Sequence, residues 1–350
     1  MKALAIGTSD FKEIIQTDAY YIDKSLFIEE LMISNKAKAM LFPRPRRFGK
    51  TLNMSMLKYF FDIDHAEENR KLFKGLAIEN SPAWAHQGKY PVIFLTFKEL
   101  KLPTFEQTII RLEGMLADLL DQNFPYLLDF EGLTPREKKY FNKIYNEEAD
   151  DASLPTFLKH AAGALKKYHG IAPILLIDEY DAPIHAAHTH GYLQGMLDFM
   201  RNFLSAGFKD NEHLTKGVIT GILRVAKENI FSGLNNITTY SILDEDFADK
   251  FGITEPEVDQ LLLDAGLSAN RETVRDWYNG YRFGDTEKIY NPWSILSFVN
   301  KKRKLVPYWV NTSSNDLIKE VLPKADKSTQ DIRFDERGKG RGKNQRVYRF

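Results

Sequence analysis

Gly49, Lys50 and Thr51 are residue types that bind phosphate. They stand between an apolar run at 39–42 and a segment with helical periodicity that begins at Leu52. The N-terminus of a helix offers free backbone N–H groups to an anion, and the helix dipole favours negative charge there. A glycine lets the backbone approach a phosphate, a lysine supplies positive charge and a threonine supplies a hydroxyl for Mg²⁺. The spacing therefore predicts a phosphate site at this turn, Leu52 included, with Thr51 as a magnesium ligand.

Three arginines precede this turn in the segment RPRRFGKT, which spans 44–51. The common phosphate-loop pattern is G-x-x-x-x-G-K-[ST], and Arg44 occupies the place of its first glycine. Guanidinium groups pair well with phosphate oxygens, so we expect Arg44, Arg46 and Arg47 to contact phosphates. Phe48 is expected in the same binding loop. The tripeptide alone is a weak signal, and a basic loop that caps a helix is the alternative interpretation.

A second candidate group follows the apolar run at 174–177, which ends in Asp178 and Glu179. Four apolar residues in succession suit a strand that is buried on both faces. Ligands of open α/β sheets bind at the carboxyl edge of the strands, so these acids are expected to face the phosphate. We expect Asp178 to bind Mg²⁺ and Glu179 to polarise the attacking water. The alternative is two solvated acids at the end of a strand. Asp181 is expected either to have a structural role or to support the residues that bind the metal.

Strand-like and helix-like segments alternate along the chain, which predicts an α/β fold with a parallel sheet of about five strands flanked by helices. The expected strands are 39–42, 91–97, 173–177, 217–220 and 237–243. His185, His188 and His190 follow the acid-ended strand, where we expect a solvated loop rather than a metal site. The character of the sequence changes after Asp244, and a helix-capping box begins at Thr254.

These patterns divide the chain into three parts. Residues 1–244 are expected to form a P-loop ATPase-like domain, and residues 245–315 a small helical lid or winged-helix-like domain. Residues 316–350 end in a run rich in Gly, Arg and Lys with few apolar side chains, and we expect this tail to be disordered or aberrant.

Composition excludes several classes of protein. The 350 residues contain 48 Lys+Arg and 48 Asp+Glu, so the net charge gives no whole-chain argument for nucleic acid or a membrane surface as partner. The lack of cysteine excludes disulfides, thiolate metal sites and cysteine nucleophiles. No apolar run approaches the roughly twenty residues of a transmembrane helix, so we expect a cytoplasmic protein without a membrane span.

Several motifs recur in an order that resembles one protein family. They are YIDKS (21–25), RPRRFGKT (44–51), ILLIDEYDAPI (174–184), TGILRVAKENIFSGLNN (220–236), FGITEPEV (251–258), WYNGYRFG (277–284) and YNPWSIL (290–296). Over about residues 5–315 the chain is similar to the bacterial AAA-ATPase-like family, P-loop ATPases of the AAA+/STAND sort. RPRRFGK[ST] is that family's form of the phosphate loop, so Arg44 is the expected variant.

The resemblance implies Mg²⁺-dependent ATP hydrolysis, with Lys50, Glu179 and Thr220 as catalytic residues. In P-loop ATPases with an additional central strand, a polar residue at the end of that strand senses the γ-phosphate, and Thr220 holds this place. Thr51 and Asp178 would bind the metal, and the residues of the loop would bind ATP. Hydrolysis would be coupled to an unknown protein partner, and an oligomer is compatible with the family.

Two rival functions stay open beside the ATPase. The first is a slow-hydrolysing, nucleotide-gated switch that exposes a surface to a partner. The second is a module in which the loop arginines bind the phosphate backbone of a nucleic acid, a partner that the ATPase does not require. Arg224 is a further candidate for a phosphate contact, with a surface salt bridge as the alternative. Family members often continue into a PD-(D/E)XK nuclease domain. The required acid pair is missing beyond Asn311, so no nuclease activity is predicted.

Overall fold

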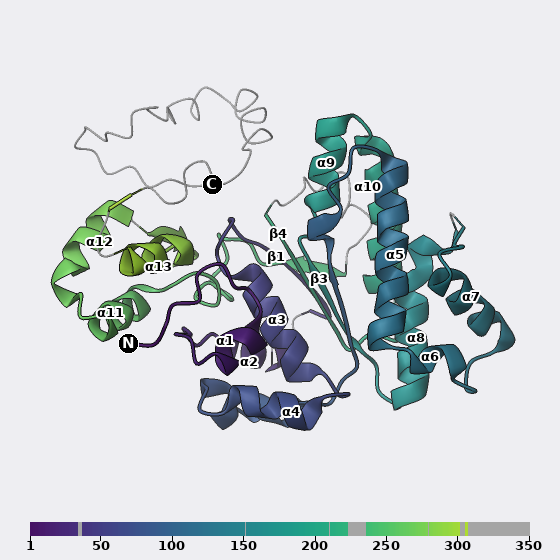
Figure 1. Ribbon diagram of the computed structural model, residues 1–350, viewed down its shortest axis with the longest axis horizontal. Helices are drawn as coiled ribbons and strands as arrows, with labels where there is room; N and C mark the ends of the chain where they lie inside the picture. Colours follow the sequence, from purple (N-terminus) through teal and green to yellow (C-terminus); the bar gives the residue numbers. More distant parts are fainter. Residues whose placement is uncertain are drawn as a thin grey trace. The chain divides into compact units, whose positions relative to one another are not determined.

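The main sheet of the computed structural model has five parallel strands in the order β2-β3-β4-β1-β5 (Figure 1). The strands are β1 (Ala39–Pro43), β2 (Val92–Thr96), β3 (Ile174–Asp178), β4 (Lys216–Gly221) and β5 (Ile237–Thr239). Strand β4 lies in the middle, where Ile219 pairs with Leu41 on one side and Ile177 on the other. The predicted α/β fold with a parallel sheet of five strands is confirmed.

The structure describes residues 1–33, 37–150, 152–209, 211–222, 236–278, 280–301 and 305–306. Met1–Tyr308 make up one compact unit of the chain. The tail predicted at 316–350 and the candidate Arg224 lie outside the described residues. None of the helices in the described ranges combines the length and the apolar character that a bilayer crossing needs.

Both faces of the sheet are buried. Successive side chains of a strand point to opposite faces, so Met40 and Phe42 pack into one core and Leu41 into the other. The side chains of β3 alternate in the same way, so Leu176 belongs to the core that contains Met40 and Ile177 to the core that contains Leu41. Burial on both faces is the reason that these strands appear in the sequence as unbroken apolar runs.

Helices cover the two faces (Figure 1). On the side of Met40 lie α1 (Phe11–Gln16), α2 (Leu26–Ile33), α3 (Lys50–Phe61) and α4 (Ala66–Arg70). On the side of Leu41 lie α5 (Phe105–Asn123), α6 (Tyr126–Asp129), α7 (Pro135–Tyr145), α8 (Phe157–His169), α9 (Ala182–His190) and α10 (Leu193–Phe208). Short 3₁₀ helices are η1 (Lys71–Phe73), η2 (Ala77–Asn80), η3 (Pro82–His86), η4 (Phe97–Glu99), η5 (Leu154–Thr156) and η6 (Ser268–Asn270).

The C-terminal module, defined here as residues 245–301, has three α-helices, the 3₁₀ helix η6 and an antiparallel hairpin among its described residues. The α-helices and strands are α11 (Glu255–Asp264), α12 (Arg271–Tyr278), β6 (Tyr281–Phe283), β7 (Thr286–Ile289) and α13 (Pro292–Asn300). Its apolar core includes Leu261 and Phe298, and Tyr20 from the N-terminal segment packs against it. Lys24 Nζ also forms a 2.6 Å ion pair with Glu257. The module therefore packs on the segment that precedes α2.

Two segments differ from the sequence-based prediction. The strand expected at 237–243 ends at Thr239, because Asp244 Oδ2 accepts hydrogen bonds from the backbone and the hydroxyl of Ser241 and closes a turn. A solvated loop was expected around the three histidines. This prediction is wrong, because the segment forms helix α9. Ile184 and neighbouring alanines of α9 pack into the core beneath it, and this burial stabilises the helix.

Candidate functional site

The turn between β1 and α3 is shaped by left-handed backbone. Gly49 lies at the N-cap of α3 with φ of 80°, and Arg47 has φ of 66°. Glycine adopts this region freely, whereas another residue is strained there by about 1–2 kcal/mol. A Cβ at Gly49 would meet no atom within 4 Å, so backbone conformation rather than space favours glycine. Gly49 has no side chain that could cap α3, so among the described residues the first N–H groups of the helix are left for another acceptor.

Lys50, the first residue of α3, is buried within this turn. Its ammonium Nζ donates to the carbonyl oxygens of Arg44 at 3.1 Å and of Pro45 at 3.0 Å. Burial lowers the pKa of Lys50, and the nearby carboxylates of Asp181 and Asp178 oppose this shift. The ammonium is therefore close enough to the strand acids to interact with their charge, while backbone carbonyls are its hydrogen-bond partners.

Two threonine hydroxyls converge on Asp178. Thr51 Oγ1 donates to Asp178 Oδ2 at 2.7 Å, and Thr220 Oγ1 donates to Oδ1 at 2.5 Å. Asp178 is 1% exposed and Thr220 is fully buried. The sheet order produces this arrangement, because Asp178 ends β3, Thr220 lies near the end of the adjacent β4, and α3 begins beyond the same edge of β1. The structure thus brings together the turn at 44–51, Asp178 and Thr220. This turn is called the phosphate turn below, after its predicted role, and Asp178 and Glu179 are called the strand acids.

Glu179 follows Asp178 in a left-handed conformation, with φ of 52°. Its side chain is 28% exposed, and its Oε2 lies 3.8 Å from Lys101 Nζ. Strained non-glycine residues of this kind cluster at functional sites, where surrounding structure holds them. Sequence reasoning missed Lys101. The signal that could have found it is its place shortly after β2, whose carboxyl end lies at the same edge of the sheet as Glu179.

Asp181 holds the end of β4 in place. Its Oδ2 accepts a hydrogen bond from the backbone N–H of Ile222 at 2.9 Å and lies 3.3 Å from His185 Nε2. The carboxylate is 2% exposed, and a Cβ at Gly221 would lie only 2.8 Å from its Oδ1. This close packing fixes the backbone directly after Thr220.

Comparison with known proteins places the chain in a family. Residues 5–231 match the model of a family described as Predicted AAA-ATPase. The chain belongs to this AAA-ATPase-like family. A protein of Azotobacter chroococcum mcd 1, described as an uncharacterized protein in the vnfD 5' region, is 30% identical over 326 residues. That alignment covers 92% of this chain and 56% of the relative, so the chain spans little more than half of that protein's length.

Arg44 of this AAA-ATPase-like chain has partners other than the expected phosphate. Its guanidinium is fully buried and donates to the carbonyl oxygens of Tyr240 at 2.6 Å and Phe247 at 3.5 Å. The ring centres of Phe251 and Phe283 lie 5.0 and 5.4 Å from its guanidinium carbon. Burial lowers the pKa of Arg44 to about 10. The side chain therefore joins the end of β1 to the segment after β5.

The other side chains at 46–52 of this AAA-ATPase-like chain differ in their surroundings, because one has an unused hydrogen-bond donor and others are packed against apolar groups. Arg46 Nη1 is buried and has no hydrogen-bond partner in the part of the chain that the structure describes. The guanidinium carbon of Arg47 lies 3.8 Å from the ring centre of Trp293. Phe48 is fully buried, and Leu52 packs partly buried against the core beside α3. Arg46 thus has a donor left for an anion, whereas the side chains of Phe48 and Leu52 support the turn by packing.

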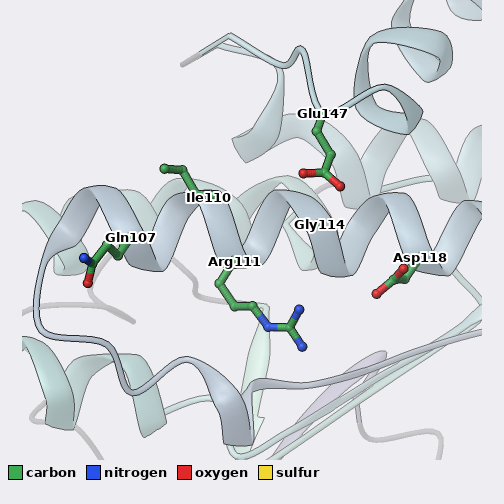
Figure 2. Close-up of a pocket in the computed structure, with 6 residues that line it drawn as sticks. All are labelled: Gln107, Ile110, Arg111, Gly114, Asp118 and Glu147. Carbon is green, nitrogen blue, oxygen red and sulfur yellow. The ribbon is translucent and has the colours of Figure 1, made fainter.

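A hollow of about 390 Å³ lies elsewhere, over α5 (Figure 2). It is lined by Gln107, Ile110, Arg111, Gly114, Asp118 and Glu147. Glu147 reaches over α5, where a Cβ at Gly114 would come within 3.8 Å of its Oε1, and Arg111 is paired with Glu99. No residue of the phosphate turn or of the strand acids lines this hollow, so it is separate from the candidate site of the AAA-ATPase-like chain.

Proposed function

We propose that the chain binds Mg²⁺-ATP at the carboxyl edge of its sheet and hydrolyses the γ-phosphate. The observation that carries this proposal is the hydrogen bond from Thr51 to Asp178, which joins the phosphate turn to the strand acid. Membership of the AAA-ATPase-like family supports nucleotide binding in general terms. The residues at this edge divide between phosphate binding, metal binding and orientation of water.

Donors without acceptors make the turn fit a triphosphate. Arg46 Nη1 is buried without a partner among the described residues, and no side chain caps α3. A buried donor that lacks an acceptor costs about 1–3 kcal/mol, which a phosphate oxygen would recover. Lys50 would exchange its two carbonyl acceptors for phosphate oxygens, since an ammonium is attracted more strongly by an anionic oxygen than by a neutral carbonyl.

Thr51 and Asp178 offer oxygen ligands of the kind that Mg²⁺ takes at phosphate sites, where water and phosphate oxygens complete the shell. When bound, the ion supplies positive charge to the β- and γ-phosphate oxygens. Thr220 holds one carboxylate oxygen of Asp178 and would keep that side chain oriented while the other oxygen faces the metal. This gives Thr220 a route by which the end of β4 responds to the γ-phosphate.

Glu179 is the candidate that orients the attacking water. It is adjacent to the metal-side acid, its side chain is partly exposed and its backbone is held in a strained conformation. A carboxylate in this position would accept a hydrogen bond from water and direct the oxygen toward the γ-phosphate in line with the leaving group. Lys50 would neutralise the negative charge that develops on the transferred group.

A nucleotide-gated switch is the second candidate, and the pairing of Glu179 with Lys101 favours it. A carboxylate that is held by a lysine is less free to orient water, so hydrolysis would be slow until the pair separates. The nucleic-acid module has less support, because the Arg44 guanidinium is fully buried and donates to backbone carbonyls.

We further propose that residues 1–244 form the nucleotide-binding unit and that residues 245–315 act as its lid. The separate apolar core of the C-terminal module supports this division, and a 2.7 Å hydrogen bond from Tyr20 to Asp264 joins the module to the N-terminal segment. Coupling to a protein partner, assembly into an oligomer and a cytoplasmic location stay predictions.

The test is calorimetric titration of the full chain with Mg²⁺-ATP and Mg²⁺-ADP, followed by measurement of ATP turnover and of molecular size. We expect saturable binding of both nucleotides and a turnover of about 1 per second or more. Binding with turnover several orders of magnitude slower would favour the switch instead. No binding of either nucleotide at millimolar concentration would refute both candidates.

A further inference from the structure

The C-terminal module holds the phosphate turn from one side. Asn291 Nδ2 donates to the carbonyl oxygen of Arg46 at 3.3 Å, and the ring centre of Trp293 lies 3.8 Å from the guanidinium carbon of Arg47. Asn291 and Trp293 stand at the start of α13, so two consecutive loop residues meet the same corner of the module. This corner lies outside residues 5–231, the range that matches the family model.

The next loop residue, Phe48, is held by the same module. The backbone N–H of Gly252 donates to the Phe48 carbonyl oxygen at 3.1 Å, and the Phe48 ring meets Tyr281 edge-on at 5.1 Å between ring centres. A Cβ at Gly252 would lie 2.9 Å from Phe48 Cδ1, so a glycine there permits the close approach. The module and the turn are therefore in direct van der Waals and hydrogen-bond contact.

Asn291 uses both ends of its amide at this contact. Its Oδ1 accepts a hydrogen bond from the backbone N–H of Ser294 at 3.3 Å, which caps α13, while Nδ2 donates to Arg46. The carbonyl end of the amide can only accept and the NH₂ end can only donate, so one orientation satisfies both bonds. The beginning of α13 and the loop carbonyl are thus fixed in a single geometry.

Arg47 combines a strained backbone with a stacked side chain. Its positive φ is unfavourable for a residue with a Cβ and persists only where contacts hold it. A guanidinium above an indole face is attracted by the ring quadrupole. Stacking uses the flat face of the guanidinium and leaves its N–H edge available, so the same group can donate to a phosphate oxygen.

We propose that Trp293 is a positioning residue of the phosphate turn: its indole face holds the Arg47 guanidinium so that the N–H edge meets bound phosphate. The inference rests on the proposed nucleotide binding and assigns part of the phosphate site to the C-terminal module. Nucleotide affinity then depends on the docking of α13, and bound nucleotide stabilises that docking in return, because coupling between two binding equilibria is reciprocal.

The experiment measures the Kd of Mg²⁺-ADP by calorimetry for a set of full-length variants. Trp293→Leu keeps apolar bulk but removes the aromatic face, and should weaken binding about tenfold. Trp293→Phe, with a smaller aromatic face, should fall between Trp293→Leu and the unmodified chain. Trp277→Leu alters a 43% exposed tryptophan of the same module and is the matched control, with affinity unchanged.

A double variant separates positioning from a general effect on structure. If Trp293 acts through Arg47, Arg47→Ala combined with Trp293→Leu should bind no more weakly than Arg47→Ala alone. Losses that multiply in the double variant, or unchanged affinity in Trp293→Leu, overturn the inference. If Trp293→Leu does not fold, Trp293→Phe decides, and affinity equal to that of the unmodified chain counts against the proposal.

A spectroscopic readout makes the result independent of stability. The fluorescence of Trp293, taken as the difference between the unmodified chain and Trp293→Phe, should change when Mg²⁺-ADP is added, and should not change in Arg47→Ala. A chain that binds no nucleotide at all would remove the proposed function. If the chain binds nucleotide but the fluorescence of Trp293 does not change, only this inference is refuted.

Discussion

The Thr51 hydroxyl donates a 2.7 Å hydrogen bond to Asp178, a residue 127 positions further along the chain. Thr51 belongs to the first turn of α3 and Asp178 is the last residue of β3. Thr220 donates to the other oxygen of the same carboxylate. Three segments of the chain therefore meet at one buried acid, and each can be tested separately through its contribution to nucleotide binding, turnover and stability.

Lys50→Ala should weaken ATP binding by about tenfold or more, since charge-assisted hydrogen bonds are worth about 1.5–3 kcal/mol each. The measurement is calorimetric titration with Mg²⁺-ATP. Lys58→Ala removes a lysine from the last turn of the same helix and should bind ATP normally. Equal affinities for Lys50→Ala and the unmodified chain would mean that Lys50 keeps its carbonyl partners when nucleotide binds.

Glu179→Gln should retain ATP binding and lose turnover by about 10²-fold or more, because the amide is a poor acceptor for the proton of water. The variant preserves size and hydrogen-bonding capacity, so its fold should be unaffected. Steady-state hydrolysis and calorimetry on the same preparation separate the two effects. Turnover that survives in Glu179→Gln would show that another residue orients the water.

Lys101→Ala is the companion variant for Glu179, because it removes the cation 3.8 Å from that carboxylate. Faster turnover in Lys101→Ala would show that the pair restrains hydrolysis, as the switch requires. Unchanged turnover would show that the exposed pair has little effect, which is common for surface ion pairs.

Thr220→Val should reduce ATP turnover and also lower the free energy of unfolding by about 1–2 kcal/mol, because buried Asp178 loses one of its two hydroxyl donors. Thr215→Val is a matched control just before the opposite end of β4, where the hydroxyl of Thr215 donates to the Ala172 carbonyl. Both variants should lose stability in urea unfolding, but only Thr220→Val should lose turnover. If both variants lost turnover, the loss in Thr220→Val would be explained by reduced stability and not by a role of Thr220 in hydrolysis.

Arg44→Ala and Arg46→Ala should have opposite effects, the first on stability and the second on nucleotide affinity. Arg44→Ala removes the guanidinium hydrogen bonds to the Tyr240 and Phe247 carbonyls and opens a cavity, so the free energy of unfolding should fall by about 3 kcal/mol. Arg46→Ala removes a donor that lacks a partner among the described residues, so stability should change little while Mg²⁺-ADP affinity falls. Urea unfolding and calorimetry test the pair. If Arg44→Ala instead lowered nucleotide affinity and Arg46→Ala lowered stability, the result would support the phosphate-binding role that the sequence predicts for Arg44.

Much of the sheet and of its functional edge could be predicted from contiguous residues. Strands β1 and β3 are buried on both faces, so their residues form unbroken apolar runs that are visible without a structure. The carboxyl ends of parallel strands share one edge, and Asp178 and Thr220 each stand at such an end. Lys101 could not be singled out in this way, because its only signal is its distance from the end of β2.

The sequence by itself determined the parallel α/β fold, the family and the candidate chemistry at the carboxyl edge, because apolar periodicity and turn composition are local properties. Only the tertiary structure decided what each loop arginine does. The Arg44 guanidinium donates to Tyr240 across 196 positions, and the Arg47 guanidinium lies over the ring of Trp293. Neighbouring arginines have the same chemistry, and their partners are set by which distant segments pack against them, a property of the whole core rather than of the loop.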